Sequence, residues 1–240
     1  MTTIAIIIVA SGVGSRCKNI TLPKQYSLLS NHSVLHHTIS SILYHPAINY
    51  IQVIIKKDHK YLYDSVVSNI YNKKILPPIY GGNRRQDSVR LGLQGIAHIK
   101  PDFVLIHDAC RPFITHDLVN NIIKMLDQYE GAVPVLSINE TIKIVHNNII
   151  INSINRDSVK IIQTPQAYQY QNILTCHERI YATDPHKEFT DDLSIMLDYN
   201  ITVATVKGHP DNIKITTFED LCRARIYVYN NLSIIKKSNI

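Results

Sequence analysis

The sequence predicts an α/β fold, in which helices flank a mainly parallel β-sheet. Short apolar runs rich in β-branched residues alternate with stretches of helical periodicity, which is the pattern of repeated β-α-β units. The first of these runs, residues 3–10 (TIAIIIVA), leads directly into the glycine turn Gly12-Val13-Gly14. A chain of 240 residues with 45% hydrophobic and 18% charged residues can bury a full core. We therefore expect a single domain over residues 1–240.

After the first strand, the N-terminal half alternates between strand and helix signals. Residues 52–55 (QVII) are a short apolar strand, and residues 60–72 are expected to be helical. Residues 74–80 are expected to form a third strand, which Pro77-Pro78 interrupts because proline donates no hydrogen bond to a sheet. Residues 86–99 follow as a helix, with apolar side chains spaced to share one face.

The second half repeats this alternation. Residues 102–107 (DFVLIH) are expected to form a buried strand, and residues 115–130 are expected to form a helix. Residues 131–138 (GAVPVLSI) are expected to form the next strand of the sheet. The last expected elements are two helices and the strand between them, at residues 169–182, 218–231 and 201–206. We see neither an internal repeat nor a linker that would divide the chain.

The pattern changes between residues 141 and 154. The segments TIKIV and IIINSI flank His146-Asn147-Asn148, and asparagine is favoured in the tight turn of a β-hairpin. This hairpin adds little alternating core, so we expect residues 139–156 to form an arm that covers a partner subunit. The alternative is a hairpin that faces solvent alone.

The end of the first strand has the features of an anion-binding site. A glycine turn after a buried strand presents free backbone N–H groups, and Arg16 and Lys24 add two positive charges nearby. This combination predicts a nucleoside triphosphate at the carboxyl edge of the sheet. The third glycine of a dinucleotide-binding fingerprint is missing, and the segment does not match a P-loop. The alternative is an exposed arginine and lysine after a tight turn.

Further segments point to the same site. Gly81-Gly82 would let a flat base approach the backbone, and Ser88 could form a hydrogen bond with it. Asp108 follows the strand at residues 102–107, where a ribose hydroxyl or a hydrated Mg²⁺ would lie. The remaining polar segments are NR (155–156), QTPQ (163–166), TDD (190–192) and DNIKIT (211–216).

In order along the chain, these motifs resemble those of the 2-C-methyl-D-erythritol 4-phosphate cytidylyltransferase family. The resemblance covers about residues 4–221, through GVGSR, PKQY, GGNRRQDSV, HDACRP, TIK, TPQ, TDD and NIKIT. It implies a Rossmann-like sheet of the nucleotide-diphospho-sugar transferase type and a homodimer joined through the hairpin arm. It also implies transfer of CMP from CTP to 2-C-methyl-D-erythritol 4-phosphate, with release of pyrophosphate.

The resemblance also implies a role for individual residues. The catalytic cations would be Arg16, Lys24 and Lys214. The nucleotide would be held by Ala10, Ser11, Gly12, Gly14, Gly82, Asn83, Ser88, Asp108 and Ala109. The acceptor would be held by Arg111, Thr141, Arg156, Thr164 and Thr190, with Arg156 acting in the neighbouring subunit's site. No residue is assigned directly to a metal, because Mg²⁺ would be held mainly by the CTP phosphates, with Asp108 nearby.

Two substitutions depart from the family pattern at the nucleotide site. Ser11 stands where the family usually has alanine, and Asn83 stands at an often acidic position. Asparagine still offers a carbonyl acceptor to a cytosine amino group. Two other functions stay open: a cytidylyltransferase for ribitol 5-phosphate or a similar sugar-alcohol phosphate, and a non-catalytic nucleotide-binding or nucleic-acid-binding module.

Composition narrows the expected partners. The net charge of +6 fits ligands that carry phosphate, but the basic residues are scattered and form no stripe of the kind that binds nucleic acid. No apolar run reaches about 18 residues, no leader precedes the first strand, and the cysteines form no CxxC pair. We therefore expect a cytoplasmic protein that acts on small molecules, without nucleic-acid or membrane partners.

Overall fold

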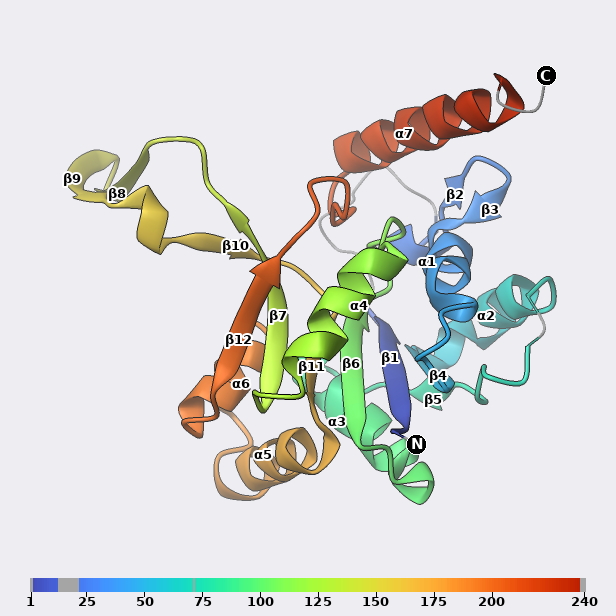
Figure 1. Ribbon diagram of the computed structural model, residues 1–240, viewed down its shortest axis with the longest axis horizontal. Coiled ribbons are helices and arrows are strands. Elements are labelled where there is room, and N and C mark those ends of the chain that lie inside the picture. The colour runs from blue at the N-terminus through green and yellow to red at the C-terminus, as the bar shows by residue number, and fades with distance from the viewer. Residues whose placement is uncertain (1, 13–21, 71, 238–240) are drawn as a thin grey trace.

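The computed structural model describes residues 2–12, 22–70 and 72–237 (Figure 1). Its centre is an eight-stranded sheet with the order β10-β7-β11-β6-β1-β4-β5, and β12 lies beside β7. The strands are β1 (Ile4–Ala10), β4 (Tyr50–Ile55), β5 (Ile79–Tyr80), β6 (Phe103–Asp108), β7 (Gly131–Ser137), β10 (Lys160–Ile162), β11 (Gln166–Gln169) and β12 (Val203–Lys207). β5, β4, β1 and β6 are mutually parallel, as are β12 and β7, whereas β10 and β11 are antiparallel to their neighbours. The predicted mainly parallel α/β fold is confirmed.

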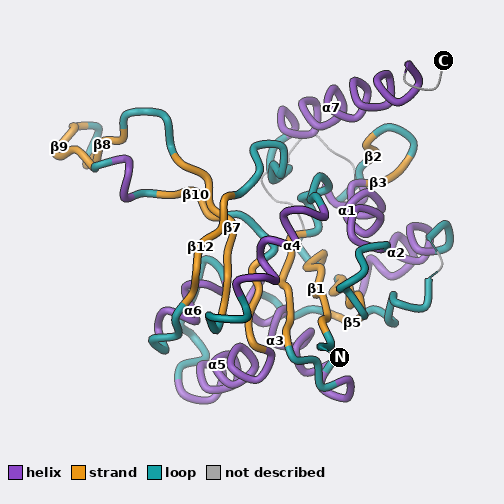
Figure 2. Tube along the Cα trace, in the orientation of Figure 1, coloured by secondary structure: helices purple, strands orange, loops and turns teal. Residues whose placement is uncertain are grey.

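Helices cover both faces of this sheet (Figure 2). One face packs against α1 (Val34–Leu43), α2 (Lys60–Val67) and α4 (His116–Met125), and the other against α3 (Arg85–Gly95), α5 (Tyr170–Thr183) and α6 (Asp192–Asp198). The last helix, α7 (Phe218–Lys237), lies beyond one end of the sheet, near the short pair β2 (Leu28–Leu29) and β3 (His32–Ser33). Short 3₁₀ helices are η1 (Lys24–Tyr26), η2 (Lys57–His59), η3 (Ala97–Ile99) and η4 (Arg156–Ser158).

The first strand shows why its sequence is continuously apolar. Successive side chains of a strand point to opposite faces of the sheet. Ile6 and Ile8 therefore join the core with α1, α2 and α4, whereas Ala5 and Ile7 join the core with α3, α5 and α6. All four side chains are fully buried. A strand covered on both faces needs an uninterrupted run of this kind.

Several expected elements have different bounds in the structure. The strand expected at residues 74–80 is reduced to β5, and Ile75 forms only an isolated bridge with Ile51. The two prolines at 77 and 78 explain this difference, since neither can donate to the sheet. The expected helices at 60–72, 86–99 and 115–130 all end earlier than predicted. The sequence analysis also did not predict α1, α6 and the short antiparallel strand β11.

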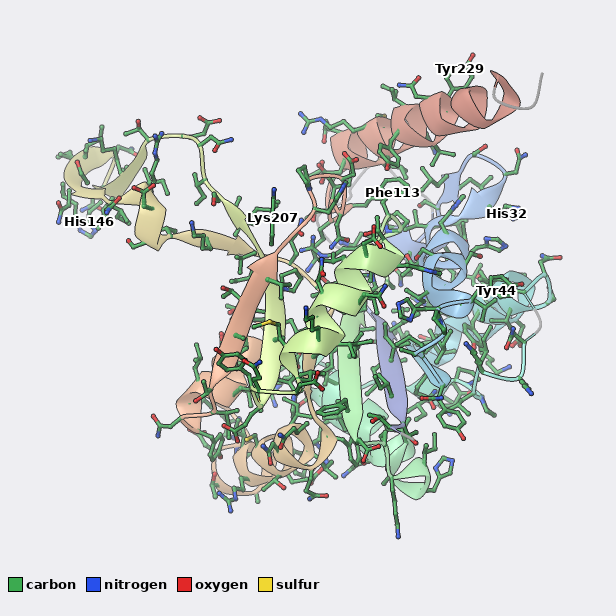
Figure 3. The ribbon with its side chains drawn as sticks, in the orientation of Figure 1. His32, Tyr44, Phe113, His146, Lys207 and Tyr229 are labelled. Atoms are coloured by element: carbon green, nitrogen blue, oxygen red, sulfur yellow. The ribbon has the colours of Figure 1, made fainter. Side chains whose placement is uncertain are left out.

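The hairpin between β7 and β10 is present. β8 (Ile142–His146) and β9 (Ile149–Ile154) pair as a separate antiparallel sheet. Asn147 and Asn148 have φ values of 47° and 64°, the left-handed conformation that asparagine tolerates in a tight turn. The hairpin projects away from the central sheet (Figure 1), and His146 lies near its tip (Figure 3). None of the helices in the described ranges is long and apolar enough to cross a membrane.

Candidate active site

A pocket lies at the carboxyl ends of β1 and β6. These strands are parallel neighbours, with Val9 opposite Asp108, so the segments that follow them meet at one edge of the sheet. The pocket has a volume of about 180 Å³. It is lined by Val9, Ser11, Gly12, Lys24, Gly82, Asn83, Arg84, Arg85, Ser88, Asp108, Ala109, Cys110 and Lys214.

Ser11, just after β1, is in direct contact with the segment that follows β5 beside this pocket. The Ser11 hydroxyl donates a 2.8 Å hydrogen bond to the Ser88 hydroxyl at the start of α3. A Cβ atom at Gly81 would lie 2.6 Å from Ser88 Oγ and 2.7 Å from Ser11 Cβ, so a larger residue does not fit. The absence of a side chain at position 81 therefore lets the second turn lie against the end of β1.

Gln25 holds the end of β1 and Gly12 in place, a role that the sequence did not reveal. Its buried amide Nε2 donates 2.8 Å hydrogen bonds to the carbonyl oxygens of both Ala10 and Gly12. Lys24 immediately precedes it as the first residue of η1. The two hydrogen bonds of Gln25 thus fix the backbone of η1 against the end of β1, and with it the backbone of Lys24.

Asp108 carries the negative charge around which three cations gather. Lys214 Nζ lies 2.9 Å and Arg111 Nε 3.4 Å from its Oδ2 atom, while Arg85 Nε lies 3.6 Å from Oδ1. Burial by itself would raise the pKa of the Asp108 carboxyl, but the charges of Arg85, Lys214 and Arg111 outweigh burial and hold it well below its usual range. The carboxyl is therefore ionised at neutral pH.

Lys214 reaches this cluster because its neighbour is anchored to the end of β6. The backbone N–H of Ile215 donates a 2.9 Å hydrogen bond to the carbonyl of Cys110, and the Ile215 side chain is fully buried. Arg111 is fixed from the same segment, since its Nη1 donates a 2.8 Å hydrogen bond to the carbonyl of Asn212. Hydrogen bonds thus hold the NIKIT and HDACRP segments against each other.

A buried chain of hydrogen bonds supports the backbone of Asp108. Its N–H donates to Thr164 Oγ1 at 3.1 Å, and Thr164 Oγ1 lies 3.0 Å from His107 Nδ1. His107 Nε2 lies 3.0 Å from the carbonyl oxygen of Arg111, which can only accept, so Nε2 carries the proton. Nδ1 then accepts from the Thr164 hydroxyl. Burial lowers the pKa of His107 to about 4, so the ring is neutral at physiological pH.

We expect His107→Gln to reduce the acid sensitivity of the fold. The unfolded chain binds a proton on this ring below about 6.5, whereas the native state does so only near 4, so the native state loses stability as pH falls through that window. Between pH 6.5 and pH 5 the wild-type free energy of unfolding should fall by about 2 kcal/mol more than that of the variant. Urea denaturation at the two pH values measures this difference. An equal loss in both proteins would contradict a neutral buried ring.

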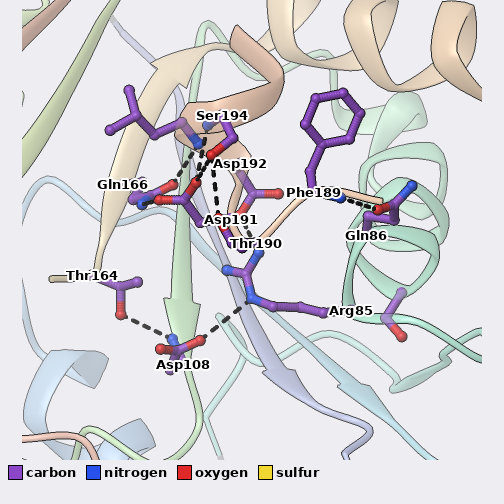
Figure 4. A network of polar contacts seen from close by, with 12 residues as sticks. Arg85, Gln86, Asp108, Thr164, Gln166, Phe189, Thr190, Asp191, Asp192 and Ser194 are labelled. Atoms are coloured by element: carbon purple, nitrogen blue, oxygen red, sulfur yellow. Dashed lines mark hydrogen bonds and ion pairs between the residues drawn. The ribbon is translucent and has the colours of Figure 1, made fainter. Parts of the chain in front are cut away.

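A second polar network extends from the pocket toward α6 (Figure 4). Arg85 Nη1 donates to the fully buried carboxylate of Asp192 at 2.7 Å, and Gln166 Nε2 donates to Asp191 Oδ2 at 2.8 Å. Thr190 precedes these two acids and is exposed. Arg85 and Gln166 belong to motifs that the sequence singled out, but their individual contacts could not be predicted.

The structure brings most of the predicted site residues together. Ser11, Gly12, Lys24, Gly82, Asn83, Ser88, Asp108, Ala109 and Lys214 line the pocket. Ala10 ends β1 beneath it, and Arg111 and Thr164 contact Asp108. Thr141 and Arg156 are exposed and belong to the hairpin arm, where Arg156 Nη1 donates to the Asn139 carbonyl at 2.6 Å. Gly14 and Arg16 lie outside the described residues.

Comparison with known proteins matches nearly the whole chain to one family. The model of the family of 2-C-methyl-D-erythritol 4-phosphate cytidylyltransferase, IspD, matches residues 4–230. A bifunctional enzyme IspD/IspF of Wolbachia pipientis wMel is 45% identical over 225 residues, which are 93% of this chain and 55% of that protein. The chain spans about half the length of the curated relatives it matches.

Two solved structures have the same fold over nearly their whole length. A 4-diphosphocytidyl-2C-methyl-D-erythritol synthase from Anaerococcus prevotii DSM 20548 superposes with a TM-score of 0.82 at 28% identity, covering 95% of this chain and 99% of that one. A 2-C-methyl-D-erythritol 4-phosphate cytidylyltransferase from Francisella tularensis gives a TM-score of 0.77 at 28% identity, covering 93% and 98%.

Proposed function

Because this chain belongs to the 2-C-methyl-D-erythritol 4-phosphate cytidylyltransferase family, we propose that it transfers CMP from CTP to 2-C-methyl-D-erythritol 4-phosphate. The products are pyrophosphate and 4-diphosphocytidyl-2-C-methyl-D-erythritol. The observation that carries this proposal is the convergence of Lys24 and Lys214, which are far apart in sequence, on one pocket that Gly12 and Gly82 also line. Such a pocket at the carboxyl edge of a parallel sheet suits a nucleoside triphosphate.

The proposed reaction is an in-line displacement at the α-phosphorus of CTP. A phosphate oxygen of the acceptor forms the new P–O bond, and the bond to the oxygen bridging the α- and β-phosphorus breaks, so that pyrophosphate leaves with the electron pair. A phosphate monoester dianion is already a nucleophile, so positioning and fixed positive charge matter more than a general base. Lys24, Lys214 and Arg16 would supply that charge, and Asp108 would hold Lys214 ready for it.

Mg²⁺ is the proposed divalent cation. Among the described residues that line the pocket, Asp108 supplies the carboxylate, and both of its oxygens already face cations. It therefore fits a water-mediated contact better than direct coordination, and the described ranges hold no cluster of three or more metal-ligating side chains. Mg²⁺ commonly keeps several waters and takes its other ligands from substrate phosphates. When bound, it would offset the negative charge of the triphosphate.

The acceptor is proposed to bind between the pocket and the arm of a second subunit. Thr164 and Arg111 lie beside Asp108, and Thr190 lies just before the N-cap of α6. Thr141 and Arg156 are carried by the projecting hairpin, so a homodimer would allow Arg156 to act in the neighbour's site (Figure 1). The apolar surface of the arm supports this arrangement. Ile149, Ile150 and Ile151 are 65%, 66% and 60% exposed, and patches of this kind usually mark an interface.

We expect the double substitution Val145→Ser/Ile150→Ser to convert a dimer into a monomer. These two residues pair across the hairpin, so the change removes adjacent apolar side chains from the arm while leaving its turn intact. Sedimentation equilibrium should give about half the wild-type mass. The matched control is Tyr44→Ser/Tyr61→Ser, which removes two exposed apolar side chains elsewhere and should remain dimeric. A monomeric wild type, or a variant that stays dimeric, would contradict the proposed arm contact.

Turnover with defined acceptors tests the proposed function. The protein is incubated with CTP, Mg²⁺ and either 2-C-methyl-D-erythritol 4-phosphate or ribitol 5-phosphate, and pyrophosphate release is measured. We expect release with the first acceptor. Exclusive use of ribitol 5-phosphate would reassign the acceptor. Nucleotide binding without turnover would instead favour a sensor, and salt-dependent affinity for DNA or RNA would favour a nucleic-acid-binding module.

A further inference from the structure

The guanidinium of Arg85 lies between two carboxylates that belong to different parts of the site. Its Nε atom is 3.6 Å from Asp108 Oδ1 at the end of β6, and its Nη1 atom is 2.7 Å from Asp192 Oδ2 at the start of α6 (Figure 4). Asp108 lines the nucleotide pocket, whereas Asp192 is fully buried away from solvent. A planar guanidinium has donors in a fixed fork, so one side chain can hold two anions at a set separation.

Asp192 depends on this contact for its charge. Burial alone would raise the pKa of the Asp192 carboxyl, but Arg85 first and His177 second outweigh burial and hold it below its usual range. His177 Nε2, from α5, lies 3.3 Å from Asp192 Oδ1. For Arg85 itself, burial would lower its pKa, but Asp192 and Asp108 outweigh burial and raise it. Asp192 is thus a buried carboxylate paired with an arginine whose side chain is 25% exposed. Removing Arg85 would leave a buried charge without its main partner and destabilise the protein.

The segment before Asp192 is held from two other elements. Gln86 Oε1, from α3, accepts a 3.0 Å hydrogen bond from the Phe189 N–H, and its Nε2 donates to the Lys187 carbonyl at 2.8 Å. Gln166 Nε2, from β11, donates to Asp191 Oδ2, and its Oε1 accepts from the Leu193 N–H at 3.0 Å. Residues 187–193 are therefore held on both sides of position 190.

Thr190 owes its location to these contacts. It lies between Phe189, held by Gln86, and the acidic pair held by Gln166 and Arg85. Its own hydroxyl is 3.3 Å from Ser194 Oγ, in the first turn of α6. Of the side chains named in this network, Arg85 is the one that also touches Asp108. It therefore connects the segment that carries Thr190 to the edge of the nucleotide pocket.

We propose that Arg85 is a positioning residue whose bridge between Asp108 and Asp192 sets the place of Thr190 relative to the nucleotide pocket. Through Thr190, it would align the acceptor phosphate with the α-phosphate of CTP. This inference rests on the proposed function. It predicts that Arg85 matters for use of the acceptor more than for binding of CTP, although its side chain lies at the nucleotide pocket.

Arg85→Lys is the informative variant. Lysine keeps the positive charge beside Asp192 but offers one point charge, so it cannot hold both carboxylates in a fixed geometry. We expect the KM for the acceptor to rise about tenfold and kcat to fall about tenfold or more, since a displacement of about 1 Å can cost 10²-fold in rate. The KM for CTP should stay within about threefold of wild type. Arg90→Gln is the matched control, because Arg90 likewise joins α3 to another element through an acidic side chain, Glu178 of α5 at 3.5 Å, and its loss should leave both KM values unchanged.

Two further measurements separate positioning from folding. In Arg85→Gln/Asp192→Asn both charges are removed together, so the double variant should be more stable than Arg85→Gln, in which the buried Asp192 loses its arginine and keeps His177. Hydrogen exchange of residues 187–193 reports the bridge without any substrate, and we expect faster exchange in Arg85→Lys than in wild type or Arg90→Gln.

The outcomes are distinguishable. An equal rise in both KM values for Arg85→Lys would mean that Arg85 acts on the nucleotide, and unchanged kinetics would mean that its bridge does not align the acceptor. Either result would overturn the inference while leaving the proposed reaction in place. A wild-type protein without turnover would contradict the proposed function instead. In that case unchanged exchange of residues 187–193 in Arg85→Lys would overturn the bridge as well, and faster exchange would support it.

Discussion

Lys24→Ala should lower kcat by about 10²–10³-fold while the protein remains folded. Lys24 lines the pocket, and its backbone position is fixed because the next residue, Gln25, donates to the carbonyls of both Ala10 and Gly12. A cation placed in advance of the reaction stabilises developing negative charge without a reorganisation cost, which is worth about 3 kcal/mol of barrier. Pyrophosphate release at saturating CTP and acceptor measures the effect.

A lysine in similar backbone surroundings provides the control for this variant. Lys57 is the first residue of the 3₁₀ helix η2, as Lys24 is of η1, but it is exposed and does not line the pocket. Lys57→Ala should keep wild-type kcat. Lys24→Arg should recover part of the lost rate, because it restores the charge with a different shape. A folded Lys24→Ala protein that releases pyrophosphate at nearly the wild-type rate would contradict the proposed catalytic role.

Asp108→Asn should lower the free energy of unfolding by about 3 kcal/mol at pH 7. The Asp108 side chain is 10% exposed and faces Arg85, Arg111 and Lys214. Lys214 can turn toward water, and Arg85 keeps Asp192, but the buried Arg111 retains only the Asn212 carbonyl among the partners described above. The repulsion among the remaining cations adds to this loss. Urea denaturation at pH 7 measures it, and pyrophosphate release should fall in parallel because Lys214 loses its anchor.

The effect of Asp108→Asn should depend on pH with a defined sign. The folded pKa of Asp108 lies below its unfolded value of 3.8, so its stabilisation is fully present above that value and is lost as pH falls below it. The stability difference between wild type and variant should therefore be constant from pH 7 to pH 5 and smaller by about 1 kcal/mol at pH 3. Asp102→Asn is the control, since Asp102 stands just before the same strand and accepts from the Thr3 N–H at an exposed site. It should cost less than about 1 kcal/mol.

The eight motifs were sufficient to recognise the family from the sequence. Each is a short pattern, and its residue types can be explained by what the backbone or a ligand requires at that place. A buried parallel strand followed by glycines can be recognised from neighbouring residues alone, and so can the asparagine turn of the hairpin. The bounds of elements were less accurate. β5 shrank to two residues because Pro77 and Pro78 cannot pair, and β11 was missed because its four residues, QAYQ, carry no apolar pattern.

The contacts within the site could not be predicted in the same way. Arg85 and Asp192 are 107 residues apart. Gln25 belongs to the PKQY motif, but the motif alone does not show that its side chain donates to the carbonyls of Ala10 and Gly12. The placement of Thr141 and Arg156 on a projecting arm was expected, and the hairpin does project away from the central sheet (Figure 1).

By itself, the sequence determined the class of fold and the edge of the sheet at which charged and glycine residues collect. Periodicity fixes which faces are apolar, and parallel strands place the residues after their carboxyl ends on one side. Only the tertiary structure decided that Arg85, Arg111 and Lys214 share the single carboxylate of Asp108. The reason is physical: the energy of a charge pair depends on separations of a few ångströms and on burial, and packing between distant segments sets both.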